Sequence, residues 1–418
     1  MINGPTEALT GNRTSGKKAV LSTIRNSAPV ARIDIANTTG LSPATVTSIT
    51  ADLILRGLLE EIPPEPAFSP ANANIKRGRP RVNLQLRGAA HLVAGIKFSG
   101  KTTTLVIVNF VGTRVAEYSV PTPFDVQTAQ ETCDFICTTL RQGLDSNGYS
   151  VSDLSGVGIG LPGIVDALEG IIRWSPTLSE RDVPLRDMLQ SALGINVFVE
   201  NDANLVTLAE QQFGLGKTAR NFIVITIEQG VGMGIVIDGK LIRGTNGSGA
   251  ELGHTKVQLD GALCRCGQRG CLEAYVGDYA LLREANSIMA NHSSDHFHHP
   301  ASTEIRMQKL VAEARDGNQI ALSIFRRAGR MFALGLANVI NIFAPELIIL
   351  SGDRMQYDFL YDADVIEDMR NSIVQFGGPP PDVRVHKWSD HMWAMGAAAY
   401  AIEGVINAEL QGVKRNVL

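Results

Sequence analysis

A short stretch between Glu251 and Glu273 constrains this chain more than any other feature. It reads ELGHTKVQLDGALCRCGQRGCLE and holds three of the five cysteines within eight residues, the first of them ten residues after a histidine. One imidazole and three thiolates complete a tetrahedral ligand set for zinc and leave no position for a reactive water. We therefore predict a structural zinc site with the ligands His254, Cys264, Cys266 and Cys271. Buried reduced thiols or a disulfide pair are the alternative.

The length and composition are those of a globular protein with two or three domains. The chain has 418 residues, of which 44% are hydrophobic and 19% charged. The start of the chain does not have the cationic and apolar pattern of a signal peptide. The longest apolar tract, Met331–Leu350, contains Asn338, Asn341, Pro345 and Glu346, which predicts a buried helix followed by a strand rather than a membrane span. We expect a cytoplasmic protein without membrane association.

The first part of the chain is basic. Residues 1–88 contain 11 Lys and Arg against 6 Asp and Glu, although the whole chain carries a net charge of −4. This asymmetry favours nucleic acid as a partner of the N-terminal end.

Residues 13–87 have the pattern of a winged helix-turn-helix domain. Residues 1–12 are polar and without period, which predicts a disordered tail. Apolar spacing predicts one helix from Lys17, a second from Ile33, and a third over residues 43–56. Ser42 is a good N-cap for this third helix, and Pro43 is a good first residue. Val46, Ile49 and Leu53 would face the core of the domain.

Two groups of residues in this domain are candidates for DNA contact. On the third helix, the outward positions that would meet base edges in a major groove are Ser42, Ala44, Thr45, Thr47 and Ser48. Short strands predicted over 58–62 and 82–86 flank a loop with four basic side chains that would enter a minor groove or contact phosphates: Lys76, Arg77, Arg79 and Arg81. An ordinary small helical bundle with a solvated basic loop is the alternative.

The remainder of the chain has alternating strands and helices, which predicts an α/β protein. The runs LVAGIKF, TLVIVNF and TRVAEYSV predict three strands, and a second set begins at Asn221. Cys133 and Cys137 lie on a predicted helix over 128–144, where we expect them to be packing residues. The histidine-rich segment 291–300 is expected to be a surface loop, with metal binding as the alternative.

Three ordered motifs carry a family resemblance. They are ENDAN at 200–204, GAELGH at 249–254 and CRCGQRGCLEAY at 264–275. Over residues 88–418 the chain resembles the ROK family of repressors, open reading frames and sugar kinases. Its first domain resembles those of ROK repressors, including their GRP wing. The resemblance implies an N-terminal winged helix-turn-helix followed by a two-lobed, actin-like (ribonuclease-H-like) ROK sugar-kinase fold. The lobes would span about 88–205 and 206–418, with the C-terminal helix returning to the first lobe.

The resemblance also implies a sugar site. In a kinase of this family, Asp202 would take the proton of the attacking sugar hydroxyl. The other sugar-binding positions would be Asn201, Glu251, His254 and Glu273. Carboxylates, an amide and an imidazole suit a sugar because each hydroxyl both donates and accepts hydrogen bonds. Taken singly, each carboxylate is more typical of a surface charge or a helix cap, and the joint match to the ordered motifs of the family favours the sugar site.

The nucleotide motifs of the family kinases are altered here. Phosphoryl transfer needs glycine-rich turns for phosphates and an acid that holds the metal. The corresponding segments read Lys97-Phe98-Ser99-Gly100-Lys101, Glu228-Gln229-Gly230 and Ser351-Gly352-Asp353, although Gly232 and Gly234 remain. A lysine replaces an acid, and a carboxylate would face the phosphates. We therefore expect Asp202 to be a vestigial base position and the protein not to be an enzyme.

The sequence thus predicts a sugar-responsive DNA-binding transcriptional regulator, most naturally a repressor, with a structural zinc. Its expected partners are operator DNA, a sugar or sugar derivative, and further copies of itself in a homodimer or homotetramer. Two alternatives stay open. One is an active ATP-dependent sugar kinase with a DNA-binding head, and the other is a regulator whose effector is a protein and whose sugar cleft is vestigial.

Overall fold

The computed structural model describes residues 5–63, 81–99, 101–122, 126–228, 230–289, 302–356, 358–360, 362–374, 379–387 and 391–411. The chain divides into two compact units. Unit 1 comprises Met1–Ile159, Leu185–Val199 and Ala397–Leu418, and unit 2 comprises Gly160–Pro184 and Glu200–Gly396. The division after Val199, rather than after residue 205, keeps helix α6 (Asp202–Phe213) whole within unit 2.

Residues 160–184 belong to unit 2, although the sequence analysis had assigned them to the first lobe. They contain a hairpin of strands β8 (Ile164–Asp166) and β9 (Ile171–Trp174). The backbone at Gly247 lies so close to this hairpin that an added Cβ would come within 1.8 Å of the Val165 carbonyl oxygen. This packing joins segments about eighty residues apart in the chain. Local sequence patterns do not reveal contacts over such a separation.

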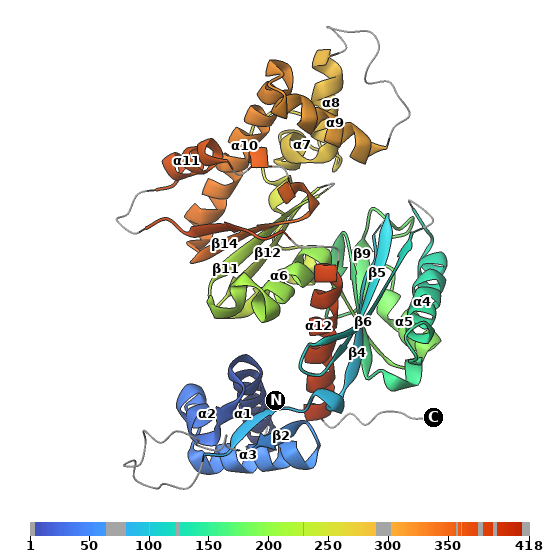
Figure 1. Ribbon diagram of the computed structural model, residues 1–418, viewed down its shortest axis with the longest axis vertical. Coiled ribbons are helices and arrows are strands. Elements are labelled where there is room, and N and C mark those ends of the chain that lie inside the picture. The colour runs from blue at the N-terminus through green and yellow to red at the C-terminus, as the bar shows by residue number, and fades with distance from the viewer. Residues whose placement is uncertain are drawn as a thin grey trace, which may run out of the picture. The chain divides into compact units, whose positions relative to one another are not determined.

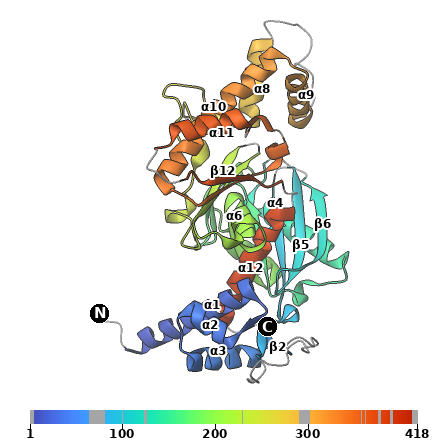
Figure 2. The ribbon, with the colours of Figure 1, turned by 60° about the vertical axis from the view of Figure 1, so that its left-hand side comes forward.

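The first part of unit 1 is a winged helix domain. Helices α1 (Pro5–Ser27), α2 (Arg32–Thr39) and α3 (Pro43–Leu55) pack together beside a three-stranded sheet (Figure 2). The sheet has the order β1 (Val30–Ala31), β3 (Asn83–Leu86), β2 (Leu59–Ile62). The side chain of Ser42 accepts a hydrogen bond from the Thr45 amide at 3.1 Å, as expected of an N-cap. Val46, Ile49 and Leu53 are buried, as predicted.

The prediction of a disordered tail over residues 1–12 was wrong for residues 5–12, because helix α1 begins at Pro5. Proline suits a first helical turn, and the following Glu7, Ala8 and Leu9 are good helix formers. The helix therefore continues towards the N-terminus from the packed segment that the apolar pattern revealed. Residues 1–4 lie outside the described part of the chain, as does the wing segment 64–80 with Lys76, Arg77 and Arg79.

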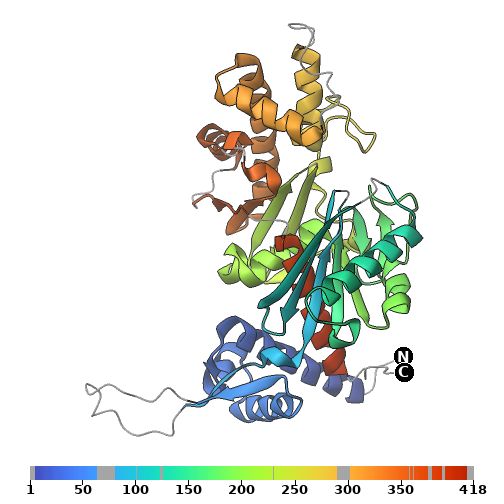
Figure 3. The same ribbon diagram turned by 45° about the vertical axis from the view of Figure 1, so that its right-hand side comes forward.

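The rest of unit 1 is built on a five-stranded sheet. Its order is β10 (Asn196–Asn201), β7 (Gly156–Leu161), β4 (Leu92–Lys97), β5 (Thr102–Asn109), β6 (Arg114–Pro121). Helices α4 (Ala129–Asp145) and α5 (Leu185–Leu193) lie on one face (Figures 1 and 3). The C-terminal helix α12 (His391–Gln411) packs on β7, where a Cβ at Gly158 would meet the Ala397 carbonyl oxygen at 1.9 Å. Residues from Ala397 onward thus belong with the first lobe.

A second five-stranded sheet forms the centre of unit 2. Its order is β13 (Lys240–Ile242), β12 (Val231–Ile237), β11 (Phe222–Ile227), β14 (Leu347–Ser351), β15 (Asp382–Val385). Strand β11 is buried on both faces, because alternate residues enter two different hydrophobic clusters. One cluster includes α6 and Trp393, and the other includes a layer of helices. Members of this layer are α7 (Glu273–Val276), α8 (Asp278–Met289), α9 (Thr303–Arg315), α10 (Gln319–Phe343) and α11 (Ala363–Ser372).

Two glycines of β12 have a packing role. A Cβ at Gly234 would lie 2.0 Å from Thr207 Oγ1, and one at Gly232 would lie 2.9 Å from the Ala203 Cβ. Both glycines let α6 lie directly on β12. The sequence marks them as what remains of a phosphate loop, but helix packing already accounts for their presence.

The tract Met331–Leu350 forms the end of α10 and most of β14, as predicted. Within the described ranges, no helix is long and apolar enough to cross a membrane. The histidine-rich segment 291–300 lies outside those ranges.

Candidate functional site

The four predicted metal ligands come together in unit 2. His254 ends a short 3-10 turn (Leu252–His254), and the three cysteines follow on a loop with two isolated bridges, Lys256 to Cys271 and Leu263 to Arg269. Gly267 and Gly270 have φ values of +85° and +76°, which a side chain would disfavour. The four ligand atoms lie within 4.8 Å of one another.

Two of the separations among these atoms match those around a tetrahedral ion. Cys266 Sγ lies 3.7 Å from Cys271 Sγ, and Cys264 Sγ lies 3.6 Å from His254 Nδ1. Around zinc, bond lengths of about 2.3 Å to sulfur and about 2.0 Å to nitrogen place two sulfurs about 3.8 Å apart, and sulfur and nitrogen about 3.5 Å apart. None of the three cysteines is in a disulfide, so the disulfide alternative is wrong. The cluster can hold a metal.

A lysine accompanies the cluster. Lys256 Nζ lies 2.9 Å from Cys271 Sγ and 2.6 Å from Gln268 Oε1. The hydrogen bond to Cys271 raises the pKa of Lys256, so its ammonium group stays charged. If a divalent ion were bound, three thiolates around it would leave one negative charge, which this cation would offset.

The first turn of α6 carries two of the predicted sugar ligands. Asn201 is the N-cap: its Oδ1 accepts from the Asn204 amide at 3.2 Å, and its Nδ2 donates to the Gly163 carbonyl at 2.8 Å. One amide hydrogen and one oxygen lone pair of this side chain remain for other partners. Asp202 follows at the first helical position, and both side chains are partly exposed.

A buried carboxylate that the sequence analysis did not single out supports this turn. Glu200 is fully buried; its Oε1 accepts from the Asn201 amide at 2.9 Å and from Asn204 Nδ2 at 3.0 Å. Its Oε2 accepts from Arg243 Nε in an ion pair. The first residue of the ENDAN motif therefore has a structural role, and only its burial with a distant arginine reveals it.

The remaining predicted sugar ligands gather near Asp202. Burial raises the pKa of Glu251, and the charges of Asp202 and Glu273 raise it further, while His254 lowers it. Cys264 Sγ lies 3.6 Å from His254 Nδ1 and 3.8 Å from Glu273 Oε1, which places these two side chains beside each other. Because His254 Nδ1 faces Cys264, Nε2 is the ring nitrogen left for another partner. The structure thus brings carboxylates, an amide and an imidazole into one region of unit 2.

Tyr279 is a further polar group at this site that the sequence analysis missed. Its hydroxyl lies 3.5 Å from Cys264 Sγ and 3.4 Å from Glu273 Oε1. Burial, together with Cys264 and Glu273, raises the pKa of Tyr279, so the hydroxyl keeps its proton and remains a donor. No motif marks this residue, because tyrosine at the start of a helix is ordinary in sequence.

The candidate DNA-contacting face lies on α3 of unit 1. All five predicted positions are exposed: Ser42, Ala44, Thr45, Thr47 and Ser48. Three of the hydroxyls have partners within the helix: Ser42 Oγ accepts from the Thr45 amide and lies 2.8 Å from Thr45 Oγ1, and Thr47 donates to the Pro43 carbonyl at 2.8 Å. Of the predicted wing cations, Arg81 lies in the described part; it is 74% exposed and 3.8 Å from Asp34.

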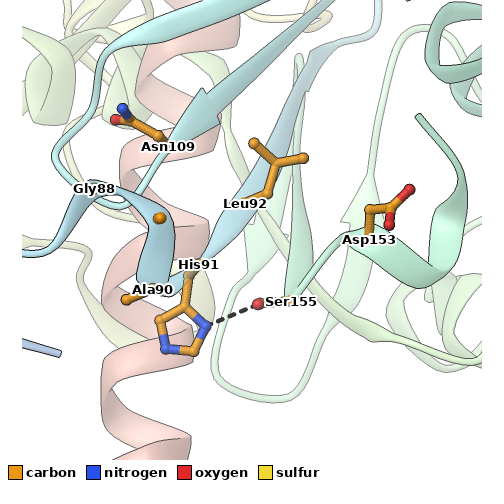
Figure 4. A pocket seen from close by; sticks show the side chains of 8 residues that line it. Gly88, Ala90, His91, Leu92, Asn109, Asp153 and Ser155 are labelled. Carbon is orange, nitrogen blue, oxygen red and sulfur yellow. Dashed lines mark hydrogen bonds between the residues drawn. The ribbon is translucent and has the colours of Figure 1, made fainter. Parts of the chain in front are cut away.

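A cavity of about 480 Å³ lies elsewhere in unit 1, where the winged helix domain leads into β4 (Figure 4). Its polar side chains are occupied internally. His91 Nδ1 is 2.8 Å from Ser155 Oγ, Asp153 accepts from the Ser150 amide at 2.7 Å, and Asn109 Oδ1 accepts from the Thr113 amide at 2.9 Å. Figure 4 shows Asn109 and Asp153 pointing away from His91, so these groups do not converge on a common ligand.

Cys133 and Cys137 on α4 are buried thiols, which agrees with the predicted packing role. Burial raises the pKa of Cys133 to about 12. A thiol with such a pKa is a poor nucleophile and a poor metal ligand.

Comparisons with known proteins place this architecture. A family model described as "ROK family" matches residues 93–403. The xylose repressor of Caldicellulosiruptor bescii is 26% identical over 394 residues, or 94% of this chain and 96% of the repressor. A crystal structure of a ROK family transcriptional regulator, a homologue of the Escherichia coli Mlc protein, covers 96% of this chain and 98% of its own with a TM-score of 0.80 and 24% identity.

A kinase is also similar. The ROK family glucokinase of Streptomyces griseus, solved with glucose and AMPPNP, has a TM-score of 0.62 and 31% identity, and it covers 75% of this chain and 100% of its own. These matches define the class: a winged helix-turn-helix joined to a two-lobed α/β body of the sugar-kinase type. The chain belongs to the ROK family.

The metal cluster generates one prediction. We expect purified wild-type protein to carry one zinc ion per chain and Cys266→Ser to lose it, since three ligands bind zinc far more weakly than four. Cys266 is exposed, so the substitution creates no cavity. Cys137→Ala, which removes a thiol outside the cluster, should keep zinc. Elemental analysis by mass spectrometry measures the zinc content of both variants. Equal zinc content in Cys266→Ser and wild type would contradict the site.

A second prediction concerns the support under the ENDAN turn. Glu200→Ala leaves Arg243 without its buried partner and should lower the free energy of unfolding by about 3–5 kcal/mol. The control is Arg220→Ala, which breaks an exposed pair with Asp238 and should cost less than about 1 kcal/mol. Urea unfolding compares the two variants. Similar losses of unfolding free energy in the two variants would mean that Glu200 does not organise the turn.

Proposed function

We propose that this protein is a sugar-responsive DNA-binding transcriptional regulator, acting as a repressor. The observation that carries the proposal is the presence in one chain of a helix with an exposed polar face in a winged helix domain and a cluster of sugar-type ligands beside a metal-binding loop. The full-length similarity to a xylose repressor supports it. Because such a protein acts on operator DNA, we infer that it works in the cytoplasm.

The sugar would bind in unit 2. Asp202, Glu251 and Glu273 offer carboxylate acceptors, while Asn201 and His254 each keep one polar atom for a hydroxyl. Several acceptors in fixed positions favour a ligand with adjacent hydroxyls over an anion, since an anion would meet carboxylate repulsion. This reasoning favours an uncharged sugar over a sugar phosphate at these residues.

Zinc is the ion we propose for the cluster. Soft thiolate ligands and tetrahedral separations suit zinc, and a closed four-ligand set makes the ion structural. The bound ion would fix His254 and hold Glu251 and Glu273, at the two ends of the loop, in position for the ligand.

Operator DNA would bind to α3 and the wing. Ala44, Thr45 and Ser48 present a methyl group, a hydroxyl with a methyl group, and a hydroxyl, which suit thymine methyl groups and polar base edges. Arg77 and Arg79 would enter the minor groove, and Lys76 and Arg81 would contact phosphates. A homodimer or homotetramer would read a two-fold symmetric operator.

Helix α12 offers a route between ligand and DNA. It starts in unit 2, where Met392 and Trp393 pack with α6, and it ends in unit 1. There the Glu409 carbonyl accepts from Arg56 Nη1 at 3.0 Å, immediately after α3. A sugar that binds two arrangements of the units unequally would shift their populations and thereby the DNA-binding head.

Sugar phosphorylation is the rival function, which the similarity to a glucokinase keeps in view. Three observations oppose it. Lys97, at the end of β4, is a buried cation in place of a metal-binding acid, and Glu228 follows β11 where phosphates would lie. After β14, Arg354 is buried and joined to Asp278 and Glu304 in an internal ion-pair network, so this segment already serves packing.

Substitutions at the two proposed sites should affect DNA binding and sugar binding separately. Arg79→Ala should weaken binding to operator DNA, selected from random sequences with wild-type protein, by about tenfold or more and leave sugar affinity unchanged. Glu251→Ala should lower sugar affinity by about tenfold or more and leave DNA affinity without sugar unchanged. Fluorescence anisotropy measures the affinity for operator DNA, and calorimetry measures the affinity for the sugar. Equal loss of both activities in folded Arg79→Ala protein would contradict separate sites.

Titration of the zinc-loaded protein with sugars, sugar phosphates and ATP, alongside an assay of ATP turnover, decides between regulator and kinase. We expect one sugar to bind and to change affinity for operator DNA, without ATP consumption. Sugar-dependent ATP turnover within a few powers of ten of ordinary kinase rates, about 1–100 per second, would overturn the regulator-only function.

A further inference from the structure

The exposed face of α3 carries few groups that can form hydrogen bonds with bases. This helix, whose 13 residues all lie in the described part of the chain, contains no Arg, Lys, Asn or Gln, the side chains that make bidentate contacts with base edges. Its one charged residue, Asp52, accepts from Lys17 Nζ at 2.6 Å and from Arg56 Nε at 3.2 Å. Base recognition by α3 therefore depends on hydroxyl and methyl groups.

The hydroxyl of Thr47 is committed to the helix itself. Thr47 Oγ1 donates to the Pro43 carbonyl oxygen, one turn earlier, at 2.8 Å. This bond uses the only proton of the hydroxyl and holds the β-branched side chain in one χ1 rotamer. Because Thr47 is exposed and its hydroxyl is turned back to the preceding turn, the group that it offers to a partner in a fixed position is its methyl group.

Ser48, the next residue, has the opposite property. Within the described residues Ser48 Oγ forms no hydrogen bond, and the side chain is exposed, so its hydroxyl can both donate and accept. Ala44 stands three residues before Thr47 and Ala51 four residues after it, which makes both of them neighbours of Thr47 on the helix surface. Both alanines are exposed. Thr47 thus lies in apolar surroundings with one available hydroxyl beside it.

We propose that Thr47 is a specificity-determining residue that selects thymine through contact between its methyl group and the C5-methyl group of the base. Thymine is the base of unmodified DNA that carries a methyl group in the major groove, and a threonine methyl group is a suitable partner for it. Ser48 supplies the hydrogen bond of this helix to an adjacent base edge. The inference rests on the proposed DNA-binding function and names the base that α3 reads.

Two substitutions at Thr47 separate its methyl group from its hydroxyl. Thr47→Val keeps the methyl group and the branched shape, whereas Thr47→Ser keeps the hydroxyl and removes the methyl group. Thr45→Ser is the matched control, because it removes a methyl group from a neighbouring exposed position and keeps the hydroxyl that lies 2.8 Å from Ser42 Oγ. All three variants should unfold in urea close to the wild-type midpoint, since both positions are on the surface.

The DNA probe is an operator duplex, selected from random sequences with wild-type protein, in which each thymine is replaced in turn by deoxyuridine. This replacement removes the C5-methyl group and keeps the base pairing. Fluorescence anisotropy should show, at one position of a half-site, a loss of wild-type affinity of about three- to fivefold, as expected for one buried methyl group. Thr47→Val and Thr45→Ser should keep this loss. Thr47→Ser should bind the thymine duplex about three- to fivefold more weakly than wild type and lose nothing further with deoxyuridine.

Failure of this inference and failure of the proposed function give different results. If no deoxyuridine replacement lowers wild-type affinity, or if Thr47→Ser keeps the full loss at that position, Thr47 does not read a thymine methyl group, although the protein binds DNA. Binding by Thr47→Val as weak as that by Thr47→Ser would also overturn the inference, because the hydroxyl would then make the contact. If wild-type protein selects no operator from random DNA, the proposed DNA-binding function itself fails.

Discussion

Convergence of four side chains that could hold a metal ion, His254, Cys264, Cys266 and Cys271, is the constraint on which the site depends. Between Glu251 and Glu273 the chain forms one short 3-10 turn and two isolated bridges, so backbone hydrogen bonding alone orders it weakly. Two of the ligand separations suit a tetrahedral ion, and Lys256 would offset the excess thiolate charge around a bound divalent ion. A structural metal contributes folding free energy directly. In this way the loop can present Glu251, His254 and Glu273 without a helix or strand beneath each of them.

The opposite side of the site depends on a buried ion pair. Glu200 and Arg243 fix the turn into α6, and the glycines of β12 let that helix lie directly on the sheet. A buried pair of this kind adds little net stability, but breaking it is costly, so it restricts the turn to one arrangement. Asn201 and Asp202 are therefore held by a rigid support. The metal loop brings the other ligands to them, and Tyr279 contacts both the loop and Glu273.

Much of the fold and the site could be read from local patterns. Ser42, Pro43 and the spacing of Val46, Ile49 and Leu53 predicted α3, because capping and helical period act within a few residues. The features that the sequence did not predict also have physical causes. Residues 5–12 are helical because a helix propagates beyond its packed part, and residues 160–184 join unit 2 through contacts far along the chain. Gly232 and Gly234, which the sequence marks as remnants of a phosphate loop, instead allow α6 to pack on β12.

The sequence by itself determined which side chains could hold a metal, since one imidazole and three thiols lie close together in the chain, and it determined the winged helix pattern. Only the tertiary structure decided how these groups are supported and connected. Glu200 has its role only beside Arg243, and Tyr279 meets Cys264 and Glu273 only in the folded chain. The reason is that periodicity and capping are local, whereas burial of a charge and hydrogen bonding between side chains depend on partners that the folded chain alone brings within a few ångströms.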